Sequence, residues 1–176
     1  MPARGLNLLI LIGVALMLLS STLFTVNETQ LALKFRWGEI VKSDYKPGLH
    51  FMLPLVNNVR KFEKRIVTQS HPSESFLTNE GKILNVDFYV KWRVKDAVAY
   101  YNATGGSQEN AARRLGEIVK DSLKSVITRL TIQQVVASER AAVTGQLLEY
   151  TGPAFDTLGV ELVDVRIRRI DLPDDV

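Results

Sequence analysis

The sequence predicts an α+β protein with one membrane-spanning helix near its N-terminus, an antiparallel or mixed sheet and packed amphipathic helices. Three observations lead to this fold class. A long apolar stretch precedes residue 27, segments with alternating apolar and polar residues follow it, and the apolar spacing lengthens to three or four after residue 105. Beyond the apolar stretch about 150 residues remain, which is enough to bury a core of ordinary size.

The apolar stretch runs from Leu6 to Val26 and contains no charged residue. At about 1.5 Å per residue, a helix of this length matches the roughly 30 Å hydrocarbon core of a bilayer. A cleaved signal peptide is the alternative, because Arg4 supplies a positive charge before the stretch, but the usual shorter apolar core and small-residue cleavage site are missing. We therefore predict a short tail over residues 1–5 and an uncleaved anchor over 6–26. The flanking charges leave its orientation open.

Residues 27–95 form the predicted β-rich first half of the domain. Apolar residues alternate with Ala, Lys and Arg from Leu31 to Trp37, which predicts a half-buried strand with Trp37 on its buried face. The pair Pro47-Gly48 predicts a turn. Residues 49–56 are mostly apolar but include a proline, which removes a sheet donor and predicts an edge strand or an irregular loop.

The clearest predicted strand covers residues 85–95, where five apolar residues alternate with polar ones. We expect its antiparallel partner over residues 59–70, with the chain reversing at residues 79–81. This arrangement predicts a sheet with one face toward the core and one toward solvent.

Residues 96–172 form the predicted α/β second half, in which apolar residues recur at helical spacing. A Thr-x-x-Gln capping box, an interior proline and a Gly stop signal mark the helix ends. The predicted elements are a helix over 109–129, a short helix from Thr131, a helix over 140–158 that breaks or restarts at Gly152-Pro153 and is closed by Gly159, a strand over 163–168, and the start of a further helix at 173–176.

Basic residues are concentrated after the predicted anchor. Eight Lys and Arg and three acidic residues lie between Lys34 and Arg65, a local balance of +5 against +3 for the whole chain. The cluster predicts contact with anionic lipid headgroups, and a solvated sheet face is the alternative. The candidate headgroup contacts are Lys34, Arg36, Arg60, Lys61, Lys64 and Arg65. The candidate interfacial apolar contacts are Phe51, Met52, Leu53 and Leu55.

The sequence offers little for catalysis. It has no cysteine and two histidines, so we predict no metal site and no cofactor. His50 lies in an apolar run and is expected to be a packing residue, and His71 is expected in a loop. No nucleophile elbow, Walker loop or dinucleotide fingerprint is present, so we predict no catalytic residues. Nucleic-acid binding is disfavoured because no basic docking element accompanies the small net charge.

Several motifs resemble the SPFH or band 7 superfamily of stomatins, prohibitins and flotillins, and most of all its bacterial HflC branch. The superfamily resemblance rests on VNETQ at 26–30, FRWGE at 35–39, PGLHF at 47–51 and LP at 53–54. The HflC-like part rests on YNATGG at 101–106 and DVRIRRIDLP at 164–173.

The resemblance implies a non-enzymatic scaffold in the bacterial inner membrane, with the N-terminus in the cytoplasm and the domain in the periplasm. It implies a large hetero-oligomeric ring or cage with an HflK-like paralogue, which modulates an FtsH-like membrane protease. It also implies that a long assembly helix begins after the Leu-Pro run, so the chain is expected to be a fragment or a truncated form. A stomatin-like organiser of membrane lipids is the main alternative, and a membrane-anchored hydrolase is a third.

Overall fold

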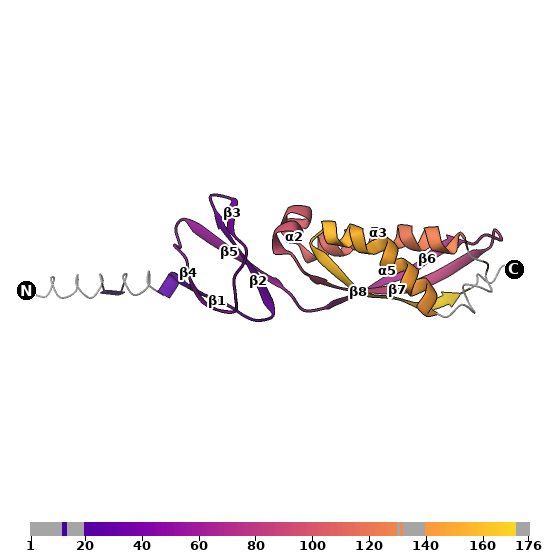
Figure 1. Cartoon of the computed structure of the whole chain (residues 1–176), viewed down its shortest axis with the longest axis horizontal. Coiled ribbons are helices and arrows are strands. Elements are labelled where there is room, and N and C mark those ends of the chain that lie inside the picture. The colour runs from indigo at the N-terminus through magenta and orange to yellow at the C-terminus, as the bar shows by residue number, and fades with distance from the viewer. Residues whose placement is uncertain (1–11, 14–19, 130, 132–139, 172–176) are drawn as a thin grey trace, which may run out of the picture. The chain divides into compact units, whose positions relative to one another are not determined.

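The computed structural model describes residues 12–13, 20–129, 131 and 140–171. The chain divides into two compact units, which are residues 1–63 (unit 1) and residues 64–176 (unit 2). The elements of each unit are labelled in Figure 1. The predicted boundary between residues 95 and 96 differs from this division, because it falls inside unit 2.

Unit 1 contains two small antiparallel sheets. In the first, β1 (Leu23–Val26) pairs with β4 (Gly48–Phe51). In the second, β2 (Gln30–Arg36) lies between β3 (Glu39–Lys42) and β5 (Asn57–Glu63). A small core joins the sheets, and its members are Phe24, Val26 and Ala32 with Tyr45, Met52 and Val59 packed against them.

Strand β2 confirms the prediction for residues 31–36, but the placement of Trp37 on its buried face was wrong. Trp37 is 86% exposed and lies in the turn after β2, with a positive φ of 53°. The following Gly38 also has a positive φ, so the chain reverses here. An alternating pattern cannot show where a strand stops, and the turn moves Trp37 off the strand.

The predicted anchor over residues 6–26 lies mostly outside the described residues. Its last four residues form β1, so the sheet begins before the predicted end of the anchor. In the part of the chain that the structure describes, no helix is both long and apolar enough to span a membrane.

Unit 2 is built on one antiparallel sheet in the order β6 (Val67–Leu77), β7 (Ile83–Val94), β8 (Val160–Asp171). The alternation predicted for β7 is confirmed, since every second residue from Leu84 to Val94 is buried. The partner predicted over residues 59–70 is confirmed for residues 67–70, which pair antiparallel with β7, but wrong for residues 59–63, which belong to β5. Strand β5 pairs with β2 in unit 1, so of these two strands only β6 pairs with β7, whose other neighbour is β8.

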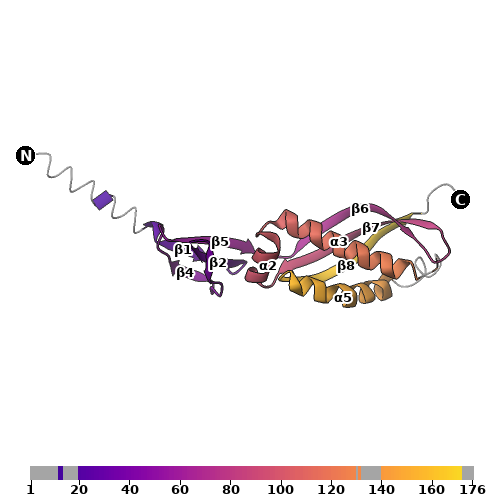
Figure 2. The ribbon, with the colours of Figure 1, turned by 90° about the horizontal axis from the view of Figure 1, so that it is seen from above.

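Three helices of unit 2 are described: α2 (Ala97–Thr104), α3 (Gln108–Ile127) and α5 (Arg140–Thr157). Helix α3 confirms the helix predicted over 109–129 and buries one apolar stripe. Helices α3 and α5 lie side by side over the same face of the sheet, as Figure 2 shows. The buried face of the sheet and these two helices share the core of unit 2, which includes Phe88, Trp92, Leu115, Leu123, Leu147 and Phe155.

Helix α5 runs through Pro153 without the predicted break. Pro153 is exposed, while Leu147, Thr151 and Phe155, spaced four residues apart, are fully buried on one face. The Thr151 hydroxyl also donates a hydrogen bond of 2.6 Å to the Leu147 carbonyl. Packing on both sides of the proline therefore outweighs its missing donor.

The end of α5 confirms the predicted stop at Gly159, which has a φ of 69° and begins the turn into β8. Strand β8 contains the predicted strand over 163–168 and extends it at both ends. The short helix predicted from Thr131 and the helix start at 173–176 lie outside the described residues, apart from Thr131 itself.

Candidate functional site

The β1–β4 pair exposes apolar side chains on one face. Leu23 lies opposite Phe51 and Thr25 opposite Leu49, and paired residues of antiparallel strands point to the same side of a sheet. Leu23, Leu49 and Phe51 are all exposed, Phe51 to 75%. We call these three residues the outer face of the pair. Leu55 lies four residues after Phe51 and is 91% exposed, so exposed apolar residues continue past the end of β4.

The opposite face of the β1–β4 pair packs inward. Met52 contacts the small core of unit 1, and its backbone N–H donates a 2.7 Å hydrogen bond to the Thr22 carbonyl. Among the predicted interfacial residues, the structure therefore exposes Phe51, Leu53 and Leu55 but leaves Met52 half-buried.

His50 lies on the inner face and is a packing residue, as predicted. Its ring lies 5.6 Å from that of Phe24 and 4.9 Å from that of Tyr45. Its Nε2 donates a 2.7 Å hydrogen bond to the Lys46 carbonyl. Burial in this cluster raises the pKa of the Tyr45 hydroxyl above its ordinary value.

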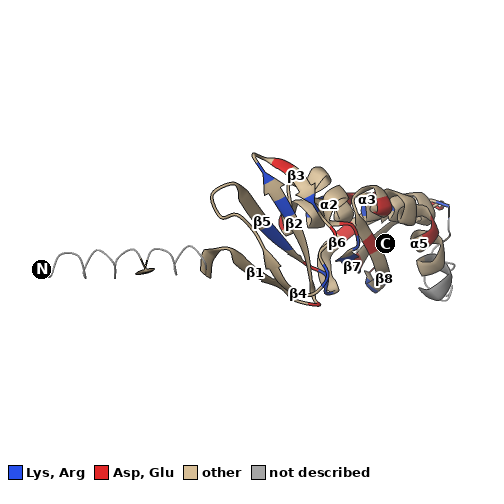
Figure 3. Ribbon diagram, turned by 60° about the vertical axis from the view of Figure 1, so that its left-hand side comes forward, with Lys and Arg blue, Asp and Glu red and all other residues tan. Residues whose placement is uncertain are grey.

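Within unit 1, the basic residues predicted to contact headgroups do not all lie on one face. Lys and Arg are visible on both β2 and β5 in Figure 3. Lys34 and Arg36 point to one face of β2, and Lys61 shares that face because it lies opposite Ala32. Arg60 lies opposite Leu33 and points to the other face. Lys64 and Arg65 belong to unit 2.

Two of these basic residues meet the apolar ones in a groove of unit 1 with a volume of about 340 Å³. The groove is lined by Thr22, Lys34, Arg36, Phe51, Met52, Leu53 and Asn57. We call it the unit 1 groove. It combines two cationic side chains with an apolar wall, a combination that suits an amphipathic anionic ligand better than a small polar one.

Asn57 positions Arg36 inside the unit 1 groove. The two residues are paired across β2 and β5, and the Arg36 Nε donates to the Asn57 Oδ1 at 3.3 Å. Asn57 is only 6% exposed, so the acceptor is held in place by its surroundings. A guanidinium has five N–H donors, and this bond uses the one on Nε.

Unit 2 contains a second histidine in an unexpected place. His71 lies in β6 rather than in the predicted loop, and its ring stacks on Phe88 with centroids 4.8 Å apart. Gly116 of α3 lies against the imidazole so closely that a Cβ there would collide with it. Burial lowers the pKa of His71, and the nearby Glu74 carboxylate partly opposes this. Glu74 itself forms an ion pair with Lys120 at 2.6 Å.

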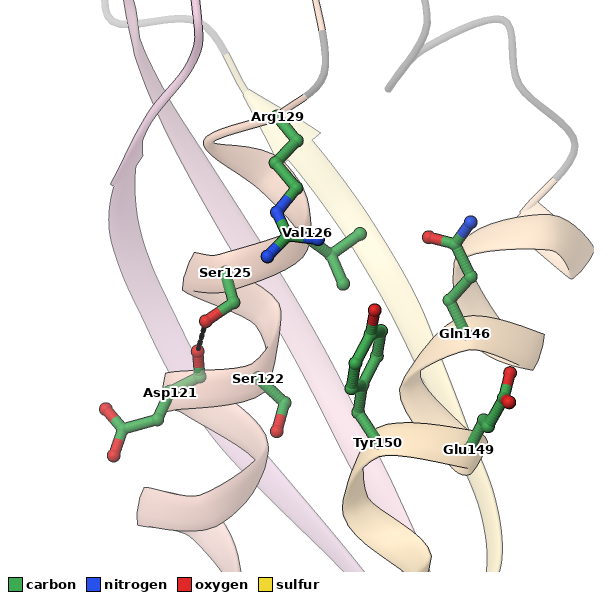
Figure 4. A pocket seen from close by; sticks show the side chains of 8 residues that line it. All are labelled: Asp121, Ser122, Ser125, Val126, Arg129, Gln146, Glu149 and Tyr150. Atoms are coloured by element: carbon green, nitrogen blue, oxygen red, sulfur yellow. Dashed lines mark hydrogen bonds between the residues drawn. The ribbon is translucent and has the colours of Figure 1, made fainter.

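A groove of about 540 Å³ lies between α3 and α5, and Figure 4 shows Tyr150 projecting into it from α5. Its serines do not form a recognisable nucleophilic site. The Ser125 hydroxyl donates to the Asp121 carbonyl of its own helix at 3.0 Å, and neither His50 nor His71 lines the groove. In the described ranges, no group of three or more His, Cys, Asp or Glu side chains is arranged to hold a metal ion.

Comparison with known proteins gives a consistent family. Residues 24–176 match the family described as "SPFH domain / Band 7 family". The chain is 34% identical over 182 aligned positions to "Protein HflC" of Buchnera aphidicola subsp. Schizaphis graminum, covering 92% of this chain and 59% of that protein. It is 31% identical over 216 positions to "Modulator of FtsH protease HflC" of Escherichia coli K12, covering 97% of this chain and 65% of that protein.

A third relative, "Protein HflC" of Haemophilus influenzae, is 34% identical over 170 positions, covering 89% of this chain and 56% of that protein. The chain thus spans 56–65% of the length of these three relatives. The family match takes in every strand from β2 onward and all three described helices. The chain belongs to the SPFH domain/Band 7 family.

Proposed function

We propose that this chain is an HflC-like, non-enzymatic scaffold subunit that modulates an FtsH-like membrane protease. The observation that carries the proposal is the 31% identity, over 97% of this chain, to a protein named as a modulator of FtsH protease.

The proposal includes attachment to a membrane through residues 6–26. The outer face of the β1–β4 pair supports it, since Leu23 lies within this segment, Leu49 and Phe51 lie on the strand that pairs with its last four residues, and all three are exposed. Large exposed apolar side chains in such number usually mark a surface that meets a partner or a membrane. In the proposed topology the N-terminus is in the cytoplasm of a bacterium, the chain crosses the inner membrane once, and units 1 and 2 are periplasmic.

The proposed partners are an HflK-like paralogue and further copies of this chain, which would form a ring or cage around the protease. We test this by coexpressing the full chain with an HflK-like subunit and an FtsH-like protease, and purifying the complex in mild detergent. We expect both partners to copurify and the degradation rate of a membrane substrate to change when the chain is omitted. Recovery of the chain with selected lipids but with neither partner would favour the stomatin-like organiser instead.

The proposal also places the exposed apolar residues of unit 1 in contact with the membrane, which can be tested with introduced cysteines because the chain contains none. Single cysteines replace Phe51 or Leu55 in unit 1 and, as matched controls, the exposed apolar residues Leu77 or Ile83 in unit 2. Each carries a polarity-sensitive fluorophore and is reconstituted in liposomes. We expect a blue-shifted emission at the unit 1 positions only. Equal emission at all four positions would contradict the proposed position of unit 1.

A further inference from the structure

The unit 1 groove places two cationic side chains beside exposed apolar ones. We propose that it binds the phosphate group of an anionic phospholipid. Lys34 and Arg36 would hold the phosphate, and the lipid chains would leave along Phe51 and Leu53. The proposal rests on the proposed membrane attachment, since the phospholipid is supplied by the bilayer.

The fold fixes the positions of the two cationic residues in the groove. Lys34 and Arg36 are two residues apart on one face of β2, so their backbones are about 7 Å apart and both side chains rise from the same side. The hydrogen bond from Arg36 Nε to the buried Asn57 fixes the plane of the guanidinium. A fixed planar guanidinium is well suited to paired contacts with phosphate oxygens, and the Lys34 ammonium adds a second point charge.

The apolar part of the groove selects a lipid over a free phosphate. Phe51 and Leu53 line the groove and remain largely exposed, so they form an apolar wall beside the cationic side chains. Inorganic phosphate cannot use this wall, whereas the glycerol backbone and first methylene groups of a phospholipid can.

The position of the groove along the chain suits a lipid headgroup. Thr22 lines the groove and lies between the charge-free stretch that precedes it and the first residue of β1. Thr22 also belongs to the anchor predicted over residues 6–26, so the wall of the groove includes a residue of that segment. The other predicted headgroup residues, among them Lys61 and Lys64, do not line this groove in the described structure.

The test is a titration of the full chain in neutral detergent with phosphatidylglycerol, in which native mass spectrometry counts the bound lipid. The double variant K34Q/R36Q should weaken binding by about tenfold or more, because two charged contacts are lost. The matched control K61Q/K64Q removes the same charge from exposed positions outside the groove and should change the affinity by less than about twofold. An equal loss in both double variants would overturn the proposal.

Two further comparisons identify the ligand. Phosphatidylcholine should bind more weakly than phosphatidylglycerol, and millimolar inorganic phosphate should not displace the lipid. Equal binding of phosphatidylcholine would show that charge is not recognised, and displacement by inorganic phosphate would show a simple anion site; either result overturns the proposal.

Two milder variants keep the test valid if K34Q/R36Q does not fold, which circular dichroism would reveal. Phe51→Ser removes an exposed part of the wall, and Arg36→Lys keeps the charge but loses the Nε bond to Asn57. Both should weaken phosphatidylglycerol binding, and unchanged binding in both would overturn the proposal. Protease copurification is measured on the same preparations. Failure of lipid binding alone rejects the groove, and failure of copurification alone rejects the proposed function.

Discussion

The two units of this chain bury their apolar residues to different extents. In unit 2 the apolar face of a three-stranded sheet is covered by α3 and α5, and its largest apolar side chains, such as Trp92 and Phe155, are almost completely buried. In unit 1, which contributes strands β1 to β5, residues as large as Phe51 and Leu55 remain exposed. Unit 2 therefore gathers its largest apolar side chains in a core and exposes only scattered ones such as Leu77 and Ile83, whereas unit 1 has an apolar surface that suits contact with a membrane or another protein.

The largest expected effect contrasts the core of unit 2 with the exposed apolar residues of unit 1. Phe155→Ala should lower the free energy of unfolding by about 3–5 kcal/mol, because it leaves a cavity in a filled core. Phe51→Ala should change it by no more than about 0.5 kcal/mol. The loss caused by Phe155→Ala is measured by urea unfolding of the full chain, followed by the circular dichroism signal of its helices. If Phe51→Ala destabilised the chain as much as Phe155→Ala, the proposed contrast between the units would fail.

Gly159 provides the next contrast, because it is both left-handed and closely packed. A Cβ at Gly159 would lie 2.5 Å from the Asp96 carbonyl oxygen and from the Tyr100 nitrogen. Gly159→Ala should therefore cost about 2–4 kcal/mol, from backbone strain and overpacking together. In unit 1, Gly38 has a φ of 92° and open space around it, so Gly38→Ala should cost only the strain, about 1–2 kcal/mol. Thermal unfolding checks both, and equal losses would contradict the role of packing at Gly159.

The contact between Gly116 and His71 should give a smaller effect. Gly116→Ala should lower the stability by about 1–2 kcal/mol, because the new methyl group displaces the imidazole from Phe88. The same substitution in a His71→Ala background should cost much less. A double-mutant cycle in urea measures the coupling between the two residues. Additive losses would show that the collision with His71 does not cause the destabilisation.

The smallest expected effect is on the pH dependence of unit 2. Burial lowers the pKa of His71 below 6.5, so the unfolded chain binds a proton before the folded chain does. The free energy of unfolding should therefore fall as the pH drops below 6.5 and level off below the folded pKa. Glu74 and Lys120 line a cavity that His71 also lines, and Glu74 reduces the size of the effect.

His71→Gln should remove this part of the pH dependence, whereas His50→Gln in unit 1 should retain it. Urea unfolding at a series of pH values between 5 and 8, chosen to bracket the ordinary histidine range of about 6.5, measures the difference from the unsubstituted chain. An identical pH profile for His71→Gln and the unsubstituted chain would show that His71 does not contribute.

The fold of unit 2 was largely predictable because its residues follow simple periods. The alternation in β7 and the helical spacing in α3 are direct consequences of burial on one face. Helix α2 was missed although both of its ends carry signals. The Asp96 side chain accepts from the N–H groups of Val98 and Ala99, and Gly105 ends the helix with a φ of 68°. A helix of eight residues with apolar residues on all sides gives no period to detect.

The pairing of strands was not predictable by the same means. Strand β5 and strand β6 follow each other closely, yet they join different sheets in different units. An alternating pattern shows which face of a strand is buried but not which other strand lies beside it. This is why the predicted partner of β7 combined the end of one strand with the start of the next.

The candidate site was predictable in residue type but not in arrangement. The sequence indicated that basic and apolar residues follow the predicted anchor. Only the pairing of β2 with β5 and of β1 with β4 shows that Lys34 and Arg36, rather than Arg60 or Lys64, share a groove with Phe51. The position of Asn57 beside Arg36 had no signal in the sequence, because the two residues are 21 positions apart.

The turn that exposes Trp37 has a practical consequence. The chain has two tryptophans, and they fall one in each unit: Trp37 is 86% exposed in unit 1, and Trp92 is 1% exposed in unit 2. A water-soluble quencher such as iodide should therefore extinguish the emission of Trp37 and spare that of Trp92. The protein thus carries a separate native optical reporter in each unit, and conformational changes in the two can be followed without any added label.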